Sequence, residues 1–336
     1  MTRIMGVLSA WVLVVGMAVA QEKVPIMGNW EGKYVARSGE TDSLRAQIVG
    51  ESWTEYRAIF FVPTDEGKEV RAEIKGKTDE KSKEGRTYFE GTVNLGEALG
   101  GAYQIKGEAA GGVFTGEFTG TETSGTIEMK RVLIQSPTLG KEPPKGAKVL
   151  MDGTDKTFQK EWIIQPRWIL DKDGSAHIQG SSIVSVRSFG DAEYHVEFCT
   201  PYMPNERGQA RGNSGVYVHG RYEVQVLDSF ADEPANNLCG GIYQIATPLL
   251  NACLPPLEWQ TYDITFIAPR FDKDGKKIKN AEITVIHNGK VIHDHLSLPT
   301  TTAGGIGIDE RSESQILLQD HGDPVRYRNI WIKPLE

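Results

Sequence analysis

Short stretches in which polar and apolar residues alternate recur along most of this 336-residue chain. The clearest is GVYVHGRYEVQVLD at 215–228, where the even positions carry Val216, Val218, Tyr222, Val224 and Val226 and the odd positions carry mostly polar side chains. Alternation with a period of two is typical of a strand that buries one face. Segments with helical periodicity are hard to find, and many of the 37 glycines lie in turn-like positions. The pattern therefore predicts an all-β fold.

The alternating segments form two groups, separated by a stretch rich in proline, glycine and lysine. In the first group, at residues 21–134, the spacing of the strands favours a small antiparallel barrel or sandwich, which we interpret as an accessory domain. The stretch QSPTLGKEPPKGAK at 135–148 is predicted to be a linker or an irregular crossover. The second group, at 149–336, includes ITVIHNGKVIHD, in which Asn288-Gly289 suits a type I′ hairpin turn. This second domain is predicted to be a two-sheet jelly-roll sandwich.

The chain begins with MTRIMGVLSAWVLVVGMAVAQE, which combines one arginine, an apolar run and the small residues Ala18-Val19-Ala20. This pattern is typical of a secretory signal peptide that is cleaved after Ala20. We therefore expect residues 1–20 to be removed and the mature protein to be exported, either to the periplasm or out of the cell. No later apolar run approaches the roughly 18 residues of a membrane span. The formal net charge of −8 disfavours a nucleic-acid partner.

The chain has three cysteines, and export makes one disulfide an expected feature. Cys239 and Cys253 lie in one loop-like region, LCGGIYQIATPLLNAC, and are the better pair. Cys199 ends the apolar strand HVEFC and is expected to be a buried thiol. The alternative is three free thiols. No CxxC or HExxH pattern indicates a zinc site.

Several long motifs in the second domain follow one another in a recognisable order: LMDGTD, FGDAEYHVEF, GNSGVYVHGRYEVQVLDS, NACLPPLEWQTYDITFIAPRFD, ITVIHNGKVIHD and LLQDHGDPVRYRNIWIKPL. In this order they resemble the 3-keto-disaccharide hydrolase domain family. The resemblance implies an exported bacterial sandwich of the concanavalin A-like, laminarinase-like type, and it does not extend to residues 21–140. Two departures stand out: His219 occupies a position where arginine is usual, and Met151 one where phenylalanine is usual.

The resemblance also implies an activity, the cleavage of glycosides that already carry a ketone at carbon 3 of a sugar. Such a ketone acidifies the C2 hydrogen, so that a base can remove it and the C1 substituent can leave by elimination. Water can then add back, which gives net hydrolysis. The route needs a base with a pKa near 7, a group that stabilises the enolate oxygen, and an acid for the leaving group.

The strand YEVQV supplies the leading candidates for this site. Glu223 and Gln225 are two residues apart, so their side chains share a face and stand about 7 Å apart. On a concave face both could contact one sugar ring, with Glu223 as base or metal ligand. Arg221 would bind sugar hydroxyls or the enolate, and His219 could do acid–base work. The turn at Gly220 leaves open whether these two share the face of Glu223, and an outer, solvated strand face remains the alternative.

The remaining candidates come from strand ends and from the turn QDHGDP. We assign catalytic roles to His321 and Asp228, while the predicted substrate ligands are Asn213, Gln319, Asp320, Arg326 and Glu197. Glu197 is expected to project onto the same concave face as Glu223. Because aspartate, glycine and proline are ordinary turn residues, the alternative for QDHGDP is a plain turn.

Three further points concern a metal ligand and two alternative functions. A divalent cation such as calcium would suit Asp228 and Asp320, but no loop has a known ligand spacing. The same groove could serve a non-catalytic carbohydrate-binding or cell-surface interaction module, because binding and catalysis both need polar residues on a concave sheet. An ordinary laminarinase-like glycosidase is disfavoured, because no E-x-D-x-x-E strand is present and Gln225 occupies the position of a second acid.

Overall fold

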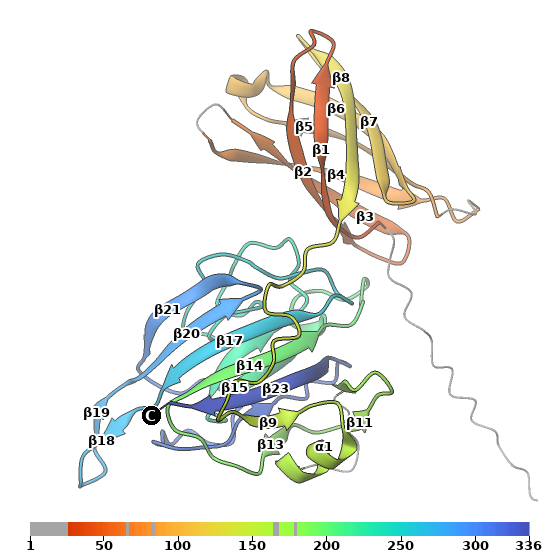
Figure 1. Cartoon of the computed structure of the whole chain (residues 1–336). Coiled ribbons are helices and arrows are strands. Elements are labelled where there is room, and N and C mark those ends of the chain that lie inside the picture. Colours follow the sequence, from red (N-terminus) through yellow and green to blue (C-terminus); the bar gives the residue numbers. More distant parts are fainter. Residues whose placement is uncertain (1–25, 65–66, 82–84, 164–167, 178–179, 336) are drawn as a thin grey trace, which may run out of the picture.

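The computed structural model describes residues 26–64, 67–81, 85–163, 168–177 and 180–335, so the predicted signal peptide lies outside the described residues. The described chain forms a closed β-barrel followed by a β-sandwich (Figure 1). The prediction of an all-β fold, with a C-terminal sandwich preceded by a small antiparallel β domain, is confirmed.

The barrel consists of eight antiparallel strands in sequence order. They are β1 (Gly28–Ala36), β2 (Thr41–Gly50), β3 (Glu55–Pro63), β4 (Glu69–Thr78), β5 (Thr87–Asn94), β6 (Ala102–Ala110), β7 (Val113–Gly120) and β8 (Ser124–Val132). β1 pairs with both β2 and β8, which closes the sheet and removes its edges. Alternate residues point inward, and the largest of them, such as Trp30, Phe89 and Phe114, are buried. A short helix, η1 (Glu97–Leu99), follows β5.

The sandwich is built from two principal sheets. The smaller one has the order β10 (Trp162–Ile163), β13 (Ile183–Ser185), β22 (Leu317–Leu318), β15 (Ser214–Val218), β16 (Tyr222–Val226). The larger one has the order β11 (Ile169–Leu170), β12 (Ala176–His177), β23 (Arg326–Pro334), β14 (Ala192–Cys199), β17 (Gln260–Ile267), β20 (Ala281–His287), β21 (Lys290–Leu298), and β9 (Lys148–Met151) also pairs with β23. Smaller elements are α1 (Asp155–Glu161), η2 (Gly208–Ala210) and the hairpin of β18 (Arg270–Phe271) and β19 (Lys277–Lys279). None of the helices in the described part of the chain has the length and apolarity needed to cross a bilayer.

The core lies between the two sheets and contains the even-numbered residues of the opening motif. Val216 and Val224 are fully buried there, together with Phe266 and Tyr327 from the larger sheet. The odd-numbered residues of β15 and β16 consequently face the other side of the smaller sheet. This alternation positions the polar residues that form the candidate site.

The segment between barrel and sandwich packs along the outer face of the larger sheet. Ser136 is buried and its hydroxyl lies 2.5 Å from that of Thr261, while Thr138 donates to Asp263 at 2.6 Å. The backbone N–H of Gly140 donates to Glu197 at 2.5 Å. The predicted linker is therefore a strap fixed by polar contacts to the sandwich.

Barrel and sandwich also touch directly. Arg131 of the barrel forms an ion pair with Glu258 of the sandwich at 3.0 Å, and Glu51 of the barrel pairs with Arg207 at 2.6 Å. A small apolar cluster joins the two bodies next to these pairs, and its buried members are Met27, Val49, Ile59, Phe230 and Ala231. Because a buried apolar cluster excludes water, the two bodies are held as a docked pair.

Candidate functional site

The hairpin of β15 and β16 presents a polar face away from the core. Tyr217 lies opposite Glu223, and Gly215 opposite Gln225, in the antiparallel register of the hairpin. The 299–309 segment covers this face, with the carbonyl of Ala303 3.0 Å from the hydroxyl of Tyr217. The 239–246 segment runs along the free edge of β16, where the N–H of Tyr243 donates to the carbonyl of Glu223. Polar side chains are thereby enclosed in the interior of the sandwich domain.

Glu223 is the central group of this face. Its side chain is only 2% exposed, and burial raises the pKa of its carboxyl to about 7, against the lowering effect of a hydrogen bond from Tyr217. That bond joins Tyr217 Oη to Glu223 Oε2 at 2.8 Å. Gln319 Nε2 donates in turn to Tyr217 Oη at 3.0 Å. A carboxyl with a pKa near neutrality can act as a general base at physiological pH.

Gly215 leaves the space in which the carboxylate lies. A Cβ added there would overlap Glu223 Oε1 and would lie 2.9 Å from the ring of Tyr217. Since real Cβ atoms do not approach other atoms this closely, any larger residue would displace the carboxylate. The tyrosine–glutamate pair therefore depends on glycine across the hairpin.

Amide side chains extend the polar face beyond Glu223. Gln225 Nε2 donates to Asn213 Oδ1 at 3.1 Å, and Asn213 Nδ2 donates to the carbonyl of Gln209 at 2.8 Å. Two amide oxygens, Gln225 Oε1 and Gln319 Oε1, are buried and have no hydrogen-bond partner among the described residues. Because an unsatisfied buried acceptor is costly, both are suited to accept hydrogen bonds from ligand hydroxyls.

Arg221 and His219, the predicted sugar ligand and acid–base group, are each engaged in contacts that hold the fold. Arg221 is buried, with Nη2 2.9 Å from Asp309 Oδ1 and Nη1 2.8 Å from the hydroxyl of Ser314, so it clamps the segment that covers the site. His219 adopts a positive φ of 54° and turns its ring onto Phe266, with centroids 4.6 Å apart. Burial lowers the pKa of His219 to about 4, so the ring is neutral. The turn thus breaks the parity of the strand.

The turn after β22 reaches the polar face through residues other than the histidine. His321 is exposed, and no described contact joins it to Glu223. The carboxylate of Asp320 accepts the N–H of Gly322 at 2.9 Å, as an ordinary turn would require. Asp323, which the sequence did not single out, accepts the N–H of Asn213 at 2.7 Å. Burial raises the pKa of Asp323, while the charge of His321 opposes this rise.

Two predicted ligands, Glu197 and Arg326, lie on the larger sheet, which corrects the prediction that Glu197 shares the face of Glu223. Glu197 belongs to β14 and points outward beneath the strap, where it accepts from Arg328 at 2.7 Å and Asn329 at 2.9 Å. These bonds, with those of His195 and Gly140, outweigh burial and lower the pKa of Glu197 to about 2. Arg326 of β23 pairs with Asp173 at 3.3 Å and lies over the ring of Trp259.

Asp228 lies at the end of β16 beside the barrel. Its carboxylate is 3.3 Å from Arg211 Nε and also accepts the N–H of Phe230. Burial raises the pKa of Asp228 to about 6, despite the opposing charge of Arg211. Within the residues described, no group of three or more His, Cys, Asp or Glu side chains gathers as a metal site would require.

The cysteine prediction is corrected as well, because all three cysteines are buried free thiols. Cys239 and Cys253 are neighbours that perturb each other's pKa, as the sequence pairing implies. Each sulfur nevertheless has another partner: Cys239 Sγ lies 3.3 Å from the hydroxyl of Tyr262, and Cys253 Sγ lies 3.6 Å from the carbonyl of Leu227.

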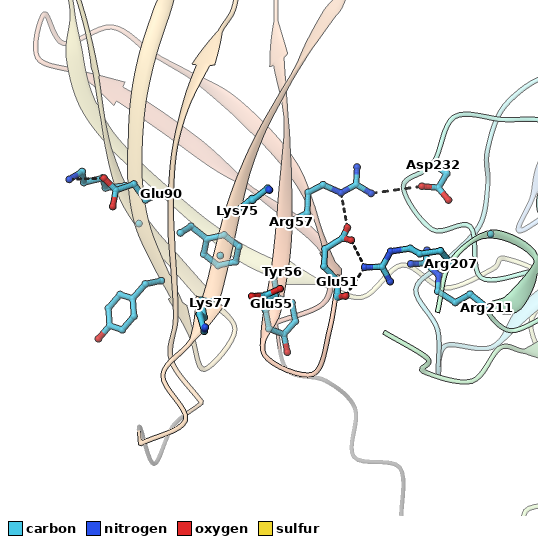
Figure 2. Close-up of a pocket in the computed structure, with 16 residues that line it drawn as sticks. Glu51, Glu55, Tyr56, Arg57, Lys75, Lys77, Glu90, Arg207, Arg211 and Asp232 are labelled. Carbon is cyan, nitrogen blue, oxygen red and sulfur yellow. Dashed lines mark hydrogen bonds and ion pairs between the residues drawn. The ribbon is translucent and has the colours of Figure 1, made fainter. Parts of the chain in front are cut away.

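A cleft of about 930 Å³ opens where barrel and sandwich meet (Figure 2). Charged side chains of both signs line it, among them Glu51, Arg57 and Lys75 from the barrel and Arg207 and Arg211 from the sandwich. The sandwich wall of the cleft includes Gly208, and the next residue supplies the amide oxygen that accepts from Gln225 at 3.3 Å. The 207–213 segment therefore connects the cleft to the edge of the polar face.

The sandwich places this chain among known proteins. The sequence profile described as "3-keto-alpha-glucoside-1,2-lyase-like domain" matches residues 146–333, which is more than half of the chain. The chain belongs to this family. The match covers nearly the whole sandwich and leaves out the barrel. The resemblance inferred from the sequence motifs is thereby confirmed.

Solved structures agree with the family. One crystal structure, described as a "putative glycosyl hydrolase" from Parabacteroides distasonis ATCC 8503, is 35% identical with a TM-score of 0.52, and the alignment covers 57% of this chain and 85% of that one. A second crystal structure with the same description and organism is 18% identical with a TM-score of 0.41, covering 57% and 95%, and carries no argument. No curated protein matches the chain. The family and the first structure identify a glycosyl hydrolase-like, carbohydrate-active protein.

Proposed function

We propose that this protein is an exported enzyme that cleaves 3-keto glycosides by removing the proton at C2, with Glu223 as the base. The observation that carries the proposal is the enclosed Glu223 carboxyl, whose pKa is raised by burial to about 7. A base with this pKa is substantially ionised at neutral pH and yet strong enough to take a proton acidified by a neighbouring ketone. An ordinary glycosidase would need a second carboxyl across the scissile bond, whereas the residue that shares the strand face of Glu223 is the amide Gln225.

The elimination balances without a cofactor. Ionised Glu223 takes the C2 proton, and the electron pair of the C–H bond passes through the enolate to form a C1–C2 double bond. The C1–O bond breaks, and the leaving oxygen takes up a proton. The sugar product keeps its C3 ketone in conjugation with the new double bond. Water adding across that bond would complete a net hydrolysis.

The neighbours of Glu223 have separate roles in this scheme. Burial and the nearby carboxylate raise the pKa of Tyr217, so its hydroxyl stays protonated and orients the carboxylate by donating to it. The free amide oxygens of Gln225 and Gln319 accept sugar hydroxyls. Because Glu223 is almost fully enclosed, entry of a sugar ring requires displacement of a covering segment. The candidate for this displacement is the 302–309 segment. Its exposed end, Asp309, is held by an ion pair with Arg221.

The test is a matched pair of variants assayed on a 3-keto glucoside with a chromogenic leaving group, in both anomers. Glu223→Gln should lower kcat/KM by about 10²–10⁴-fold, the range expected for loss of a general base. Glu206→Gln, which neutralises an exposed carboxylate on the 201–211 segment, should retain full activity. In D₂O the wild type should incorporate deuterium at C2, whereas displacement at C1 alone would leave C2 unlabelled. The corresponding glucoside without the ketone should not react.

The non-catalytic alternative predicts a different result. A binding module would retain the 3-keto glucoside with equal affinity in the wild type and in Glu223→Gln, without turnover or exchange at C2. That outcome would exclude the enzymatic proposal and leave carbohydrate binding as the function of the polar face.

A further inference from the structure

The barrel is only partly filled by its own side chains. Trp30, Phe89 and Phe114 occupy the half nearer the sandwich, where β1 begins and β8 ends. The other half contains a cavity of about 510 Å³, which we call the calyx. Barrels of eight strands either fill their interior with side chains or enclose one small ligand. A volume of this size is in the range of pockets that bury drug-sized molecules.

Most side chains that line the calyx are apolar, and its serine, threonine and glutamate residues lie at the mouth. Six of its larger side chains come from five different strands: Leu44, Phe60, Val62, Val93, Ile105 and Ile127. Two inward positions that could have filled the space carry alanine instead, namely Ala36 and Ala72. Protein interiors contain few voids larger than a water molecule, so a cavity of this size and lining is suited to a ligand.

Aromatic rings surround the mouth of the calyx. Tyr34 and Tyr103 each meet Phe118 edge to face, with ring centroids 6.0 Å apart in both pairs. The hydroxyl of Tyr103 donates to the carbonyl of Leu99 at 2.7 Å, which ties η1 to the mouth. Rings arranged in this way suit contact with a flat or ring-containing ligand.

The rim of the mouth carries charge of one sign. Glu40 and Glu122 lie there beside Ser38 and Thr123, and the described residues that line the calyx include no lysine, arginine or histidine. Carboxylates at the mouth of an apolar cavity repel an anionic head group and favour a neutral or cationic one.

We propose that the calyx binds an apolar, ring-containing small molecule with a neutral or cationic polar end. The mouth lies at the end of the barrel opposite the sandwich, because its residues come from the far ends of β1, β2, β7 and β8 (Figure 1). The ligand is therefore distinct from the substrate of the polar face, and the calyx is a separate binding site on the accessory domain.

The direct test is fluorescence titration of the full-length protein with N-phenyl-1-naphthylamine, a neutral apolar probe. The wild type should bind it saturably with one site. Ala72→Phe and, independently, Ala36→Phe should fill the calyx and weaken binding about tenfold or more. Ala102→Phe places the same side chain on the exposed outer face of β6 and should leave binding unchanged. All three variants should retain the thermal stability and the sandwich activity of the wild type.

The charge of the rim is tested with 8-anilinonaphthalene-1-sulfonate, which carries a sulfonate on a similar ring system. The wild type should bind this anion about tenfold more weakly than the neutral probe. The double variant Glu40→Gln/Glu122→Gln should narrow that difference by binding the anion more tightly. Absence of saturable binding, or equal binding by Ala102→Phe and both calyx-filling variants in their folded forms, would overturn the proposal. Binding to phosphatidylcholine vesicles in place of the probe would assign the mouth to a lipid surface and overturn it too.

Discussion

Two opposing effects set the pKa of Glu223, and this balance can be tested one residue at a time. Burial disfavours the ionised carboxylate, while the hydrogen bond from Tyr217 favours it. The base must be ionised, so kcat/KM of the wild type should rise with pH and level off above about 7. Tyr217, which orients the carboxylate, thus also helps to determine the pH at which the proposed enzyme works.

Tyr217→Phe removes the favourable hydrogen bond and should raise the pKa of Glu223 further. A hydrogen bond to a charged group is worth about 1.5–3 kcal/mol, so the acidic limb of the pH–rate profile should move up by about one pH unit or more. Activity at pH 7 should fall and recover by about pH 9. The measurement is kcat/KM against pH.

Tyr222→Phe is the matched control for this shift. Tyr222 precedes Glu223 on β16 but faces the other way, where its hydroxyl donates to Glu310 at 2.7 Å. Its loss should leave the acidic limb in place. An unshifted limb in Tyr217→Phe would show that the tyrosine does not act on the base.

At the scale of elements, the β15–β16 hairpin depends on residues that its alternation does not reveal. The apolar residues at even positions predict both strands, and the Tyr217–Glu223 pair follows from a short turn between them. The segments at 239–246 and 299–309, which lie against the hairpin, are not part of its alternating pattern, so strand periodicity contains no information about them. The role of Arg221 as a clamp for Asp309 was therefore out of reach of sequence analysis.

Gly215→Ala should damage the site without unfolding the sandwich. The added Cβ would meet the Glu223 carboxylate and the ring of Tyr217, so the carboxylate has to move out of its place. We expect kcat/KM to fall about tenfold or more, since small displacements of catalytic groups are costly. The melting temperature should fall by only a few degrees.

Gly190→Ala provides the comparison in the same domain. A Cβ there would lie 3.4 Å from the carbonyl of Ser312, which is ordinary van der Waals contact, so activity should be unchanged. Full activity in Gly215→Ala would contradict the assigned position of the Glu223 carboxylate. Thermal melts of both variants separate local displacement from unfolding.

At the scale of the whole molecule, the barrel is docked to the sandwich through several ion pairs and one small apolar cluster. Phe230 is the larger of the two buried side chains that the sandwich contributes to the apolar cluster, and it is fully buried with Met27, Val49 and Ile59. The cleft of Figure 2 exists only while this docking holds, because both bodies contribute to its walls.

Phe230→Ala should weaken the docking. Truncation of a buried phenylalanine costs about 3–5 kcal/mol, which is large for an interface of this kind. We expect the barrel and the sandwich to melt separately in calorimetry, and the radius of gyration from small-angle scattering to increase. Leu249→Ala, at a position 71% exposed, should change neither measurement. A single unshifted transition in Phe230→Ala would show that the apolar cluster does not hold the two bodies together.

The sequence by itself determined the all-β fold, the order of the sandwich motifs, and the pairing of Glu223 and Gln225 on one strand face, because strand alternation and turn residues act locally. Only the tertiary structure decided which polar faces are functional candidates. Glu197 and Glu223 both occupy buried strands, but the strap covers one and the candidate site encloses the other. Closure of the barrel and the space left inside it depend likewise on the pairing of β1 with β8, which lie about a hundred residues apart. Contacts between segments distant in the chain, and the burial they cause, are what a local pattern cannot contain.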